Sequence, residues 1–102
     1  MQIYNGYSNF IPKNTASQVL HTGRGFVHMV IASLDMPAGG SDGTLTLYDN
    51  TAASGNILLR IHVLTYSDPL TLQLDRVHAL KFSTGLTAVT TTYVDAYVLT
   101  EF

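Results

Sequence analysis

The sequence predicts an all-β protein, an antiparallel β-sandwich or jelly-roll-like fold of seven to eight strands with an extended N-terminal arm. Three observations lead to this class. Short runs rich in β-branched and aromatic residues alternate with polar ones, turn-forming clusters separate them, and no window has the period of an amphipathic helix. The 102 residues suffice for one packed domain. We assign residues 1–14 to the arm and residues 15–102 to the sandwich.

The stretch from Gly43 to Arg60, which reads GTLTLYDNTAASGNILLR, predicts a hairpin around which the other strands are arranged. Leu45 and Leu47 alternate with threonine and tyrosine, so we expect both leucines in the core. Residues 49–56 are rich in turn-forming types, and the extended pattern stops there. It resumes in a second strand, whose expected inward residues are Ile57, Leu59, Ile61 and Val63.

The run FVHMVIASL at residues 26–34 predicts a central strand, because it is apolar on both faces. The second sheet would pack on one face of this strand, and the arm or a partner chain would pack on the other. Strict alternation places one set of side chains on the first face, namely Phe26, Val30, Ala32 and Leu34. It places Val27, Met29 and Ile31 on the second.

Further extended segments complete the predicted sandwich, at residues 15–22, 70–75, 76–82, 86–90 and 92–102. Gly23-Arg24-Gly25 and Asp68-Pro69 are turn signals between strands. The last segment alternates most clearly, and its predicted common face comprises Val94, Ala96, Val98 and Thr100.

The N-terminal segment is too apolar for a solvated tail, because disordered segments are usually poor in aromatic residues. It therefore either docks on its own domain or crosses to a neighbouring subunit. The residues that would make this contact are Ile3, Tyr4, Tyr7, Phe10 and Ile11. Pro37, in the loop MPAGGSD at residues 36–42, is a further candidate contact.

The charge content is unusually low. Charged residues make up 12% of the chain and hydrophobic residues 46%, whereas an ordinary soluble domain has roughly 25% charged residues. Such a surface is typical of an assembly subunit, although a small β-domain with a Thr/Ser-rich exterior is the plainer alternative. The net charge of −2 argues against a nucleic-acid partner. No apolar run is long enough for a membrane span, and residues 1–14 lack the charged-then-apolar layout expected of a signal peptide. The sequence contains no cysteine.

Residues able to do chemistry are scattered. The four histidines, His21, His28, His62 and His78, form no metal-binding spacing, and no serine stands in a nucleophile elbow. Asp42 and Asp49 resemble calcium-loop residues only singly, and single aspartates are ordinary turn formers. We expect that the protein is not an enzyme and that it binds no cofactor, metal ion or small-molecule substrate. His62 shares a strand face with Arg60, which suits an intersubunit contact better than general-base catalysis.

The string GTLTLYDNTAASGNIL resembles a pattern in small structural proteins of tailed-bacteriophage virions, where G-T-x-T-L-Y-D-N-T-x-x-S-G follows a hydrophobic strand and a Gly-rich loop. HTGRGFVHMVIAS resembles the preceding strand, and LKFSTGL and VDAYVLTE resemble the segments that follow. The similarity spans roughly residues 16–101. It implies a β-sandwich that decorates or cements a capsid, or that sits in the tail or neck.

The resemblance implies a virion structural protein, most specifically a capsid decoration protein on the capsid surface, assembled in the host cytoplasm. The major capsid protein would be its partner, and such proteins are commonly homotrimers. Two alternatives stay open. One is a tail, neck or fibre subunit. The other is a carbohydrate- or receptor-binding β-module, whose candidate stacking residues are Tyr48, Tyr66, Tyr93 and Tyr97.

Overall fold

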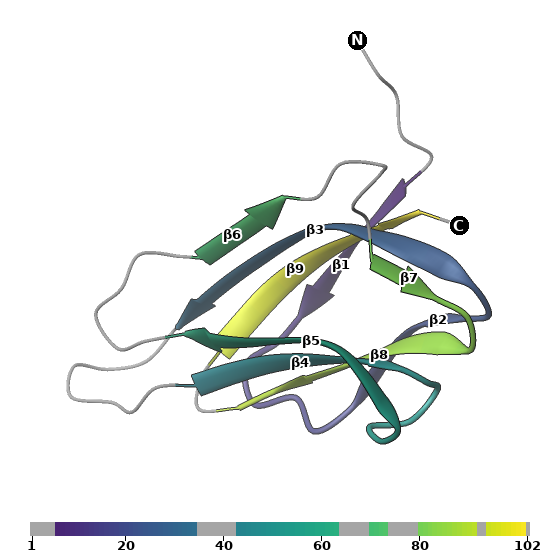
Figure 1. The fold of residues 1–102 in the computed structure, drawn as a ribbon. Coiled ribbons are helices and arrows are strands. Elements are labelled where there is room, and N and C mark those ends of the chain that lie inside the picture. The colour runs from purple at the N-terminus through teal and green to yellow at the C-terminus, as the bar shows by residue number, and fades with distance from the viewer. Residues whose placement is uncertain (1–5, 35–42, 64–69, 74–79, 92–93, 102) are drawn as a thin grey trace, which may run out of the picture.

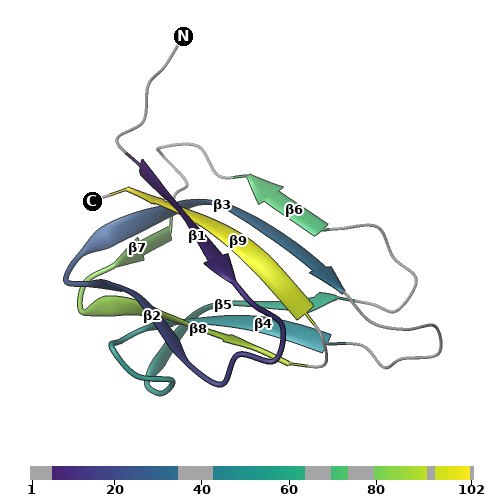
Figure 2. The same ribbon diagram turned by 180° about the vertical axis from the view of Figure 1, so that it is seen from behind.

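The computed structural model describes residues 6–34, 43–63, 70–73, 80–91 and 94–101, and these residues form nine strands and no helix. The strands make two antiparallel sheets that lie face to face (Figures 1 and 2). The five-stranded sheet contains β1 (Gly6–Ile11), β3 (Gly25–Leu34), β6 (Leu70–Gln73), β7 (Leu80–Phe82) and β9 (Val94–Glu101). The four-stranded sheet contains β2 (Gln18–Thr22), β4 (Gly43–Asp49), β5 (Asn56–Val63) and β8 (Gly85–Thr90). The all-β class is thus confirmed, whereas a strand count of seven or eight is not.

Strand pairing is nested around the β4–β5 hairpin. β4 pairs with β5, β3 with both β6 and β7, β2 with β8, and β1 with β9, all antiparallel. Two more ladders, β3 with β9 and β4 with β8, complete the sheet orders β1-β9-β3-β6 and β2-β8-β4-β5. The hairpin at residues 43–60 is therefore the innermost pair, and every outer pair joins segments that are more distant in sequence.

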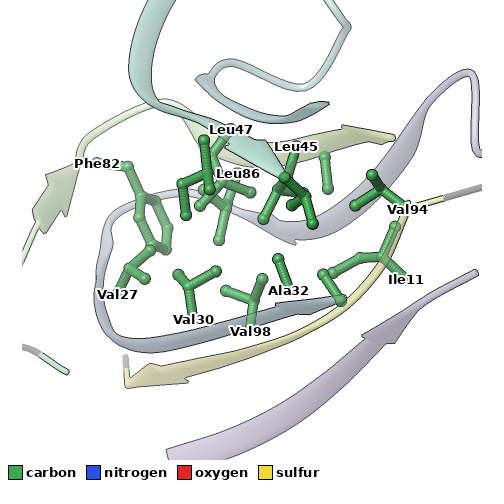
Figure 3. Packing of buried hydrophobic residues seen from close by; sticks show 14 residues of the cluster. Ile11, Val27, Val30, Ala32, Leu45, Leu47, Phe82, Leu86, Val94 and Val98 are labelled. Carbon is green, nitrogen blue, oxygen red and sulfur yellow. The ribbon is translucent and has the colours of Figure 1, made fainter. Parts of the chain in front are cut away.

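The hydrophobic core lies between the two sheets (Figure 3). Alternation along β9 supplies one side of it, because Val94, Ala96 and Val98 are almost fully buried while Tyr97 is exposed. This is the alternation that the sequence predicts for the last strand. The complete buried cluster comprises Ile11, Val27, Val30, Ala32, Leu45, Leu47, Ile61, Val63, Phe82, Leu86, Ala88, Val94, Ala96 and Val98.

The predicted faces of β3 are wrong at its N-terminal end. Val27 pairs with Thr100 and Met29 with Leu99, so His28 is an extra residue at a β-bulge. A bulge shifts the alternation by one residue. Val27 therefore joins Val30 and Ala32 in the core at 0% exposure, and Phe26 lies on the opposite face with 36% of its surface exposed. The two residues exchange the places that strict alternation assigns.

A second register shift changes β5 in the same way. Leu47 pairs with Leu59 and Tyr48 with Ile57, which leaves Leu58 as the extra residue. Ile61 and Val63 are buried as predicted, and Leu59 packs against the core. Ile57, however, is 47% exposed instead of facing inward.

The predicted N-terminal arm contributes a strand to its own domain. β1 is hydrogen-bonded along β9, from Gly6 opposite Glu101 to Ile11 opposite Ala96. Ile11 is fully buried in the core. Of the expected arm, residues 6–11 thus belong to the sandwich, and residues 1–5 lie outside the described residues.

Candidate interaction surface

The outer face of the five-stranded sheet, turned away from the core, is rich in apolar side chains. Phe10 from β1, Phe26 from β3 and Tyr97 from β9 are 45%, 36% and 48% exposed. Half-buried aliphatic side chains lie on the same face of β3 and β9. We call this surface the aromatic face, and it comprises Phe10, Phe26, Met29, Ile31, Tyr97 and Leu99.

Strand register brings these residues together. Tyr97 has Phe10 opposite it on β1 and Ile31 opposite it on β3, so the three side chains form a row across the sheet. The Phe10 and Tyr97 rings are tilted against each other, with centroids 5.0 Å apart. Met29 and Leu99 form the next cross-strand pair toward the bulge. An aromatic pair at this separation stabilises the β1–β9 edge while leaving nearly half of each ring open to solvent.

Polar pairs flank the central part of the aromatic face, which is formed by Phe10, Met29, Ile31, Tyr97 and Leu99. At one end the Ser33 hydroxyl donates a hydrogen bond to the carboxylate of Asp95. At the other, His28 Nε2 lies 2.7 Å from Glu101 Oε2, and both side chains are mostly buried. Because Glu101 stands opposite Phe26 on β3, this pair separates Phe26 from the Met29–Leu99 pair. Acidic groups therefore border the central five residues, and Phe26 lies beyond them.

The outer face of the four-stranded sheet has a different character. Arg60 and His62 are exposed on β5, opposite Thr46 and Thr44 of β4. Arg60 Nε donates to Thr46 Oγ1 at 3.4 Å, and Thr44 Oγ1 lies 2.8 Å from Thr91 Oγ1. The surface around these residues is polar, and we call it the polar face. The exposed Ile57 lies at its edge, opposite Tyr48.

The interface residues predicted from sequence have different outcomes. Phe10 lies on the aromatic face, whereas Arg60 and His62 lie on the polar face of the other sheet, so the structure does not bring them together. Ile11 is buried in its own core and cannot contact a partner while the domain is folded. Tyr7 lies in β1 opposite Thr100, and its side chain is not described. Ile3, Tyr4 and Pro37 lie outside the described residues.

Asp49, expected as an ordinary turn former, connects two turns by hydrogen bonds. The carboxylate of Asp49 accepts hydrogen bonds from the backbone N–H groups of Ser83, Thr84 and Gly85 and from the Ser83 hydroxyl. The backbone hydrogen bond from Thr84 is the largest cause that lowers the pKa of Asp49 below its usual value of 3.8. The next residue, Asn50, accepts at its carbonyl from Thr87 Oγ1 at 2.7 Å. These contacts tie the β4–β5 turn to the β7–β8 turn.

Close packing between these two turns requires glycine at position 85. A Cβ atom there would lie 2.8 Å from Thr51 Cγ2 and 3.0 Å from the carbonyl oxygen of His21. The strings YDNT and STG are therefore adjacent in space, and their polar groups form hydrogen bonds with each other. No group of three or more possible metal ligands occurs among the described residues.

The aromatic face was only partly predictable. Phe10 and Tyr97 were singled out as candidates, but for different roles and as separate features. The sequence places Phe26 on the face of Val30 and Ala32, because the bulge at His28 has no clear sequence signal. The β1–β9 pairing, which places Phe10 beside Tyr97, joins opposite ends of the described chain and is not visible in local periodicity.

Within the described residues, no helix is present that could cross a membrane. Comparisons of the chain with protein-family models, with curated proteins and with solved structures return no match.

Proposed function

We propose that this chain is a non-enzymatic structural protein of a virion, most specifically a capsid decoration subunit that binds across neighbouring capsid subunits. The observation that carries the proposal is the aromatic face. Apolar side chains from three strands lie open at its centre, in a chain with only 12% charged residues. Phe10, Met29, Ile31, Tyr97 and Leu99 adjoin one another in the strand ladders with a polar pair at each end, an arrangement typical of a protein–protein interface.

The strand order supports a jelly-roll topology for the proposed virion protein. In a jelly roll, a long antiparallel hairpin is rolled into two sheets of four positions each. The nested pairs match this arrangement if β6 and β7, which both pair with β3, together fill one position. Viral capsid domains and lectins use this topology, so the fold favours a virion protein without deciding its role.

The size of the aromatic face favours many weak contacts over one strong one. The exposed parts of its three aromatic side chains amount to about 250 Å² of apolar surface, since such a side chain presents roughly 200 Å². Burying that area contributes about 6 kcal/mol before the cost of association, which is of the same order. A single contact is therefore weak. Repeated copies on a symmetric particle, or a homotrimer with linked contacts, would gain avidity.

The partner in this proposal is the major capsid protein, and the location is the outer surface of the virion. The chain binds by burying surface and performs no chemistry. Each copy would cover a joint between capsid subunits and resist their separation under internal pressure.

The test compares two double variants that change matched numbers of exposed side chains on opposite sheets. Phe10→Ser with Tyr97→Ser removes the aromatic pair, and Arg60→Ser with His62→Ser changes the polar face. Each protein is added to particles that lack it, and occupancy is measured by gold labelling and electron microscopy. We expect the first variant to lose occupancy and the second to retain it. Equal occupancy of both variants, or gold confined to the tail, would contradict a decoration role.

A carbohydrate-binding module is the second candidate, and one observation favours it. Phe10 and Tyr97 present adjacent, half-exposed rings on a flat sheet surface, an arrangement on which a sugar ring can stack. Selective binding on a glycan array, lost in the Phe10→Ser, Tyr97→Ser variant, would support this function in place of capsid decoration.

A further inference from the structure

A pocket of about 560 Å³ opens beside the aromatic face, where the β2–β3 turn meets β7. Its volume is in the range of ordinary ligand sites. Seven residues line it, and none of them belongs to the interface predicted from sequence: Arg24, Gly25, Phe26, Asp49, Lys81, Phe82 and Ser83.

Two of the five cationic side chains of the protein line this one pocket. Lys81 stands opposite Phe26 in the β3–β7 ladder, and Arg24 lies in the turn just before β3. Both are exposed, and within the described part of the chain neither makes a hydrogen bond or an ion pair. Two like charges that make no ion pair with a described residue are an unfavourable arrangement that an incoming anion would relieve.

The acid in the lining does not supply that anion. Asp49 directs its carboxylate to the donors of Ser83, Thr84 and Gly85 and forms no ion pair with Arg24 or Lys81. The lining keeps a net charge of +1, in a protein whose overall net charge is −2. The pocket is therefore a locally cationic site on a weakly acidic molecule.

The rest of the pocket is apolar. Phe26 contributes a partly exposed ring, and Phe82 is buried. Gly25 lets the Phe82 ring pack closely against β3, because a Cβ atom there would lie 2.6 Å from Phe82 Cζ. A matching ligand combines a carboxylate with a neighbouring apolar group.

The adjacent strand edge favours a peptide over a small organic acid. β7 pairs with β3 along one edge, and no described strand pairs with its other edge. Free backbone groups of an edge strand can bind an extended peptide. We propose that this pocket binds an extended peptide segment in which a glutamate or aspartate is flanked by apolar residues. The carboxylate is held by Arg24 and Lys81, and an apolar side chain packs on Phe26. The site is separate from the Phe10–Tyr97 contact and does not depend on the virion proposal.

The test is a titration of the full chain, followed by ¹H–¹⁵N chemical shifts, with acetyl-Gly-Leu-Glu-Leu-Gly-amide. We expect saturable shifts at residues 24–26 and 81–83. The same peptide with glutamine in place of glutamate should bind at least roughly fivefold more weakly, because it lacks the charge that the two cations attract. Raising the salt concentration should weaken only the glutamate peptide.

Variants separate the pocket from general charge effects. Arg24→Gln and Lys81→Gln should each weaken the glutamate peptide by roughly fivefold, which is the upper range for exposed ion pairs. Lys13→Gln is the matched control, because it removes one positive charge from the exposed turn after β1, at the opposite end of the sheet. It should leave binding unchanged.

Three results would overturn the proposal. One is the absence of shifts at the pocket, and another is equal binding of the glutamate and glutamine peptides. The third is binding of glucuronate as tight as that of the peptide, which would assign the pocket to a sugar acid. None of these results bears on capsid occupancy.

Discussion

Asp49 and Thr84, which are 35 residues apart, are joined by a hydrogen bond of 2.9 Å from the Thr84 backbone N–H to the Asp49 carboxylate. It is one of several contacts that fasten the innermost hairpin to the β7–β8 turn. The bonds are charge-assisted, because the acceptor is ionised.

Replacing this carboxylate should weaken the whole fold. In Asp49→Asn one acceptor oxygen remains and the charge is lost, so the donors of Ser83 and Thr84 lose part of their partner. We expect the free energy of unfolding to fall by about 1 kcal/mol, a modest value because the site is exposed to solvent. Urea unfolding at pH 7 measures the difference.

The same carboxylate should make stability depend on pH in the acid range. Its pKa is lower in the folded protein than the usual 3.8, so its ionised form favours folding. That contribution is present above pH 3.8 and is lost as the pH falls through the lower folded pKa. The stability difference between the native chain and Asp49→Asn should therefore shrink when urea unfolding is repeated near pH 2.5. A constant difference across this range would show that the carboxylate does not act through its charge.

The bulge at His28 makes a prediction that opposes simple alternation. Val27→Ala should cost about 2 kcal/mol of stability, because it leaves a cavity in the core. Phe26→Ala removes a larger side chain but one that is partly exposed, and it should cost less. Thermal unfolding of both variants measures which substitution causes the larger loss of stability. A greater loss for Phe26→Ala would mean that the strand keeps strict alternation.

Truncation should distinguish a strand from an arm at the N-terminus. Removal of residues 1–5 retains β1 and should leave the domain cooperatively folded. Removal of residues 1–11 eliminates β1 together with the buried Ile11, and should cost at least about 3 kcal/mol. Circular dichroism melts of the two truncated chains give the comparison. Equal melting temperatures would indicate that residues 6–11 add nothing to the sandwich.

Local patterns predicted much of this fold. The alternation of Leu45 and Leu47 and of Val94 to Val98 correctly identified core faces, because side chains in a regular strand must alternate. Turn residues between Asp49 and Asn56 marked the hairpin, and Gly55 indeed has a positive φ of 91°. Such features depend only on neighbours in sequence.

The features that the sequence does not predict all depend on contacts with segments that are distant in sequence. The bulges at His28 and Leu58 are defined by the strands opposite them, so the residues themselves carry no sign of a shift. The hydrogen bonds of Asp49 require the Ser83–Gly85 turn, and the sequence around Asp49 gives no sign of that distant turn. Likewise, Arg24 and Lys81 appear scattered until the β3–β7 ladder brings them to one pocket.

The pairing of β1 with β9 sets when this protein can fold during its synthesis. β9 is the only described strand beside β1, so the segment translated early waits for residues 94–101 to leave the ribosome. Until then the hydrogen-bonding edge of β1 has no partner among the strands that the structure describes, and the nascent polypeptide presents Phe10 and Ile11 to the chaperones around it. A product that stops before Val94 would leave β1 unpaired and deprive β3 of its longest ladder, making premature termination a direct route to aggregation.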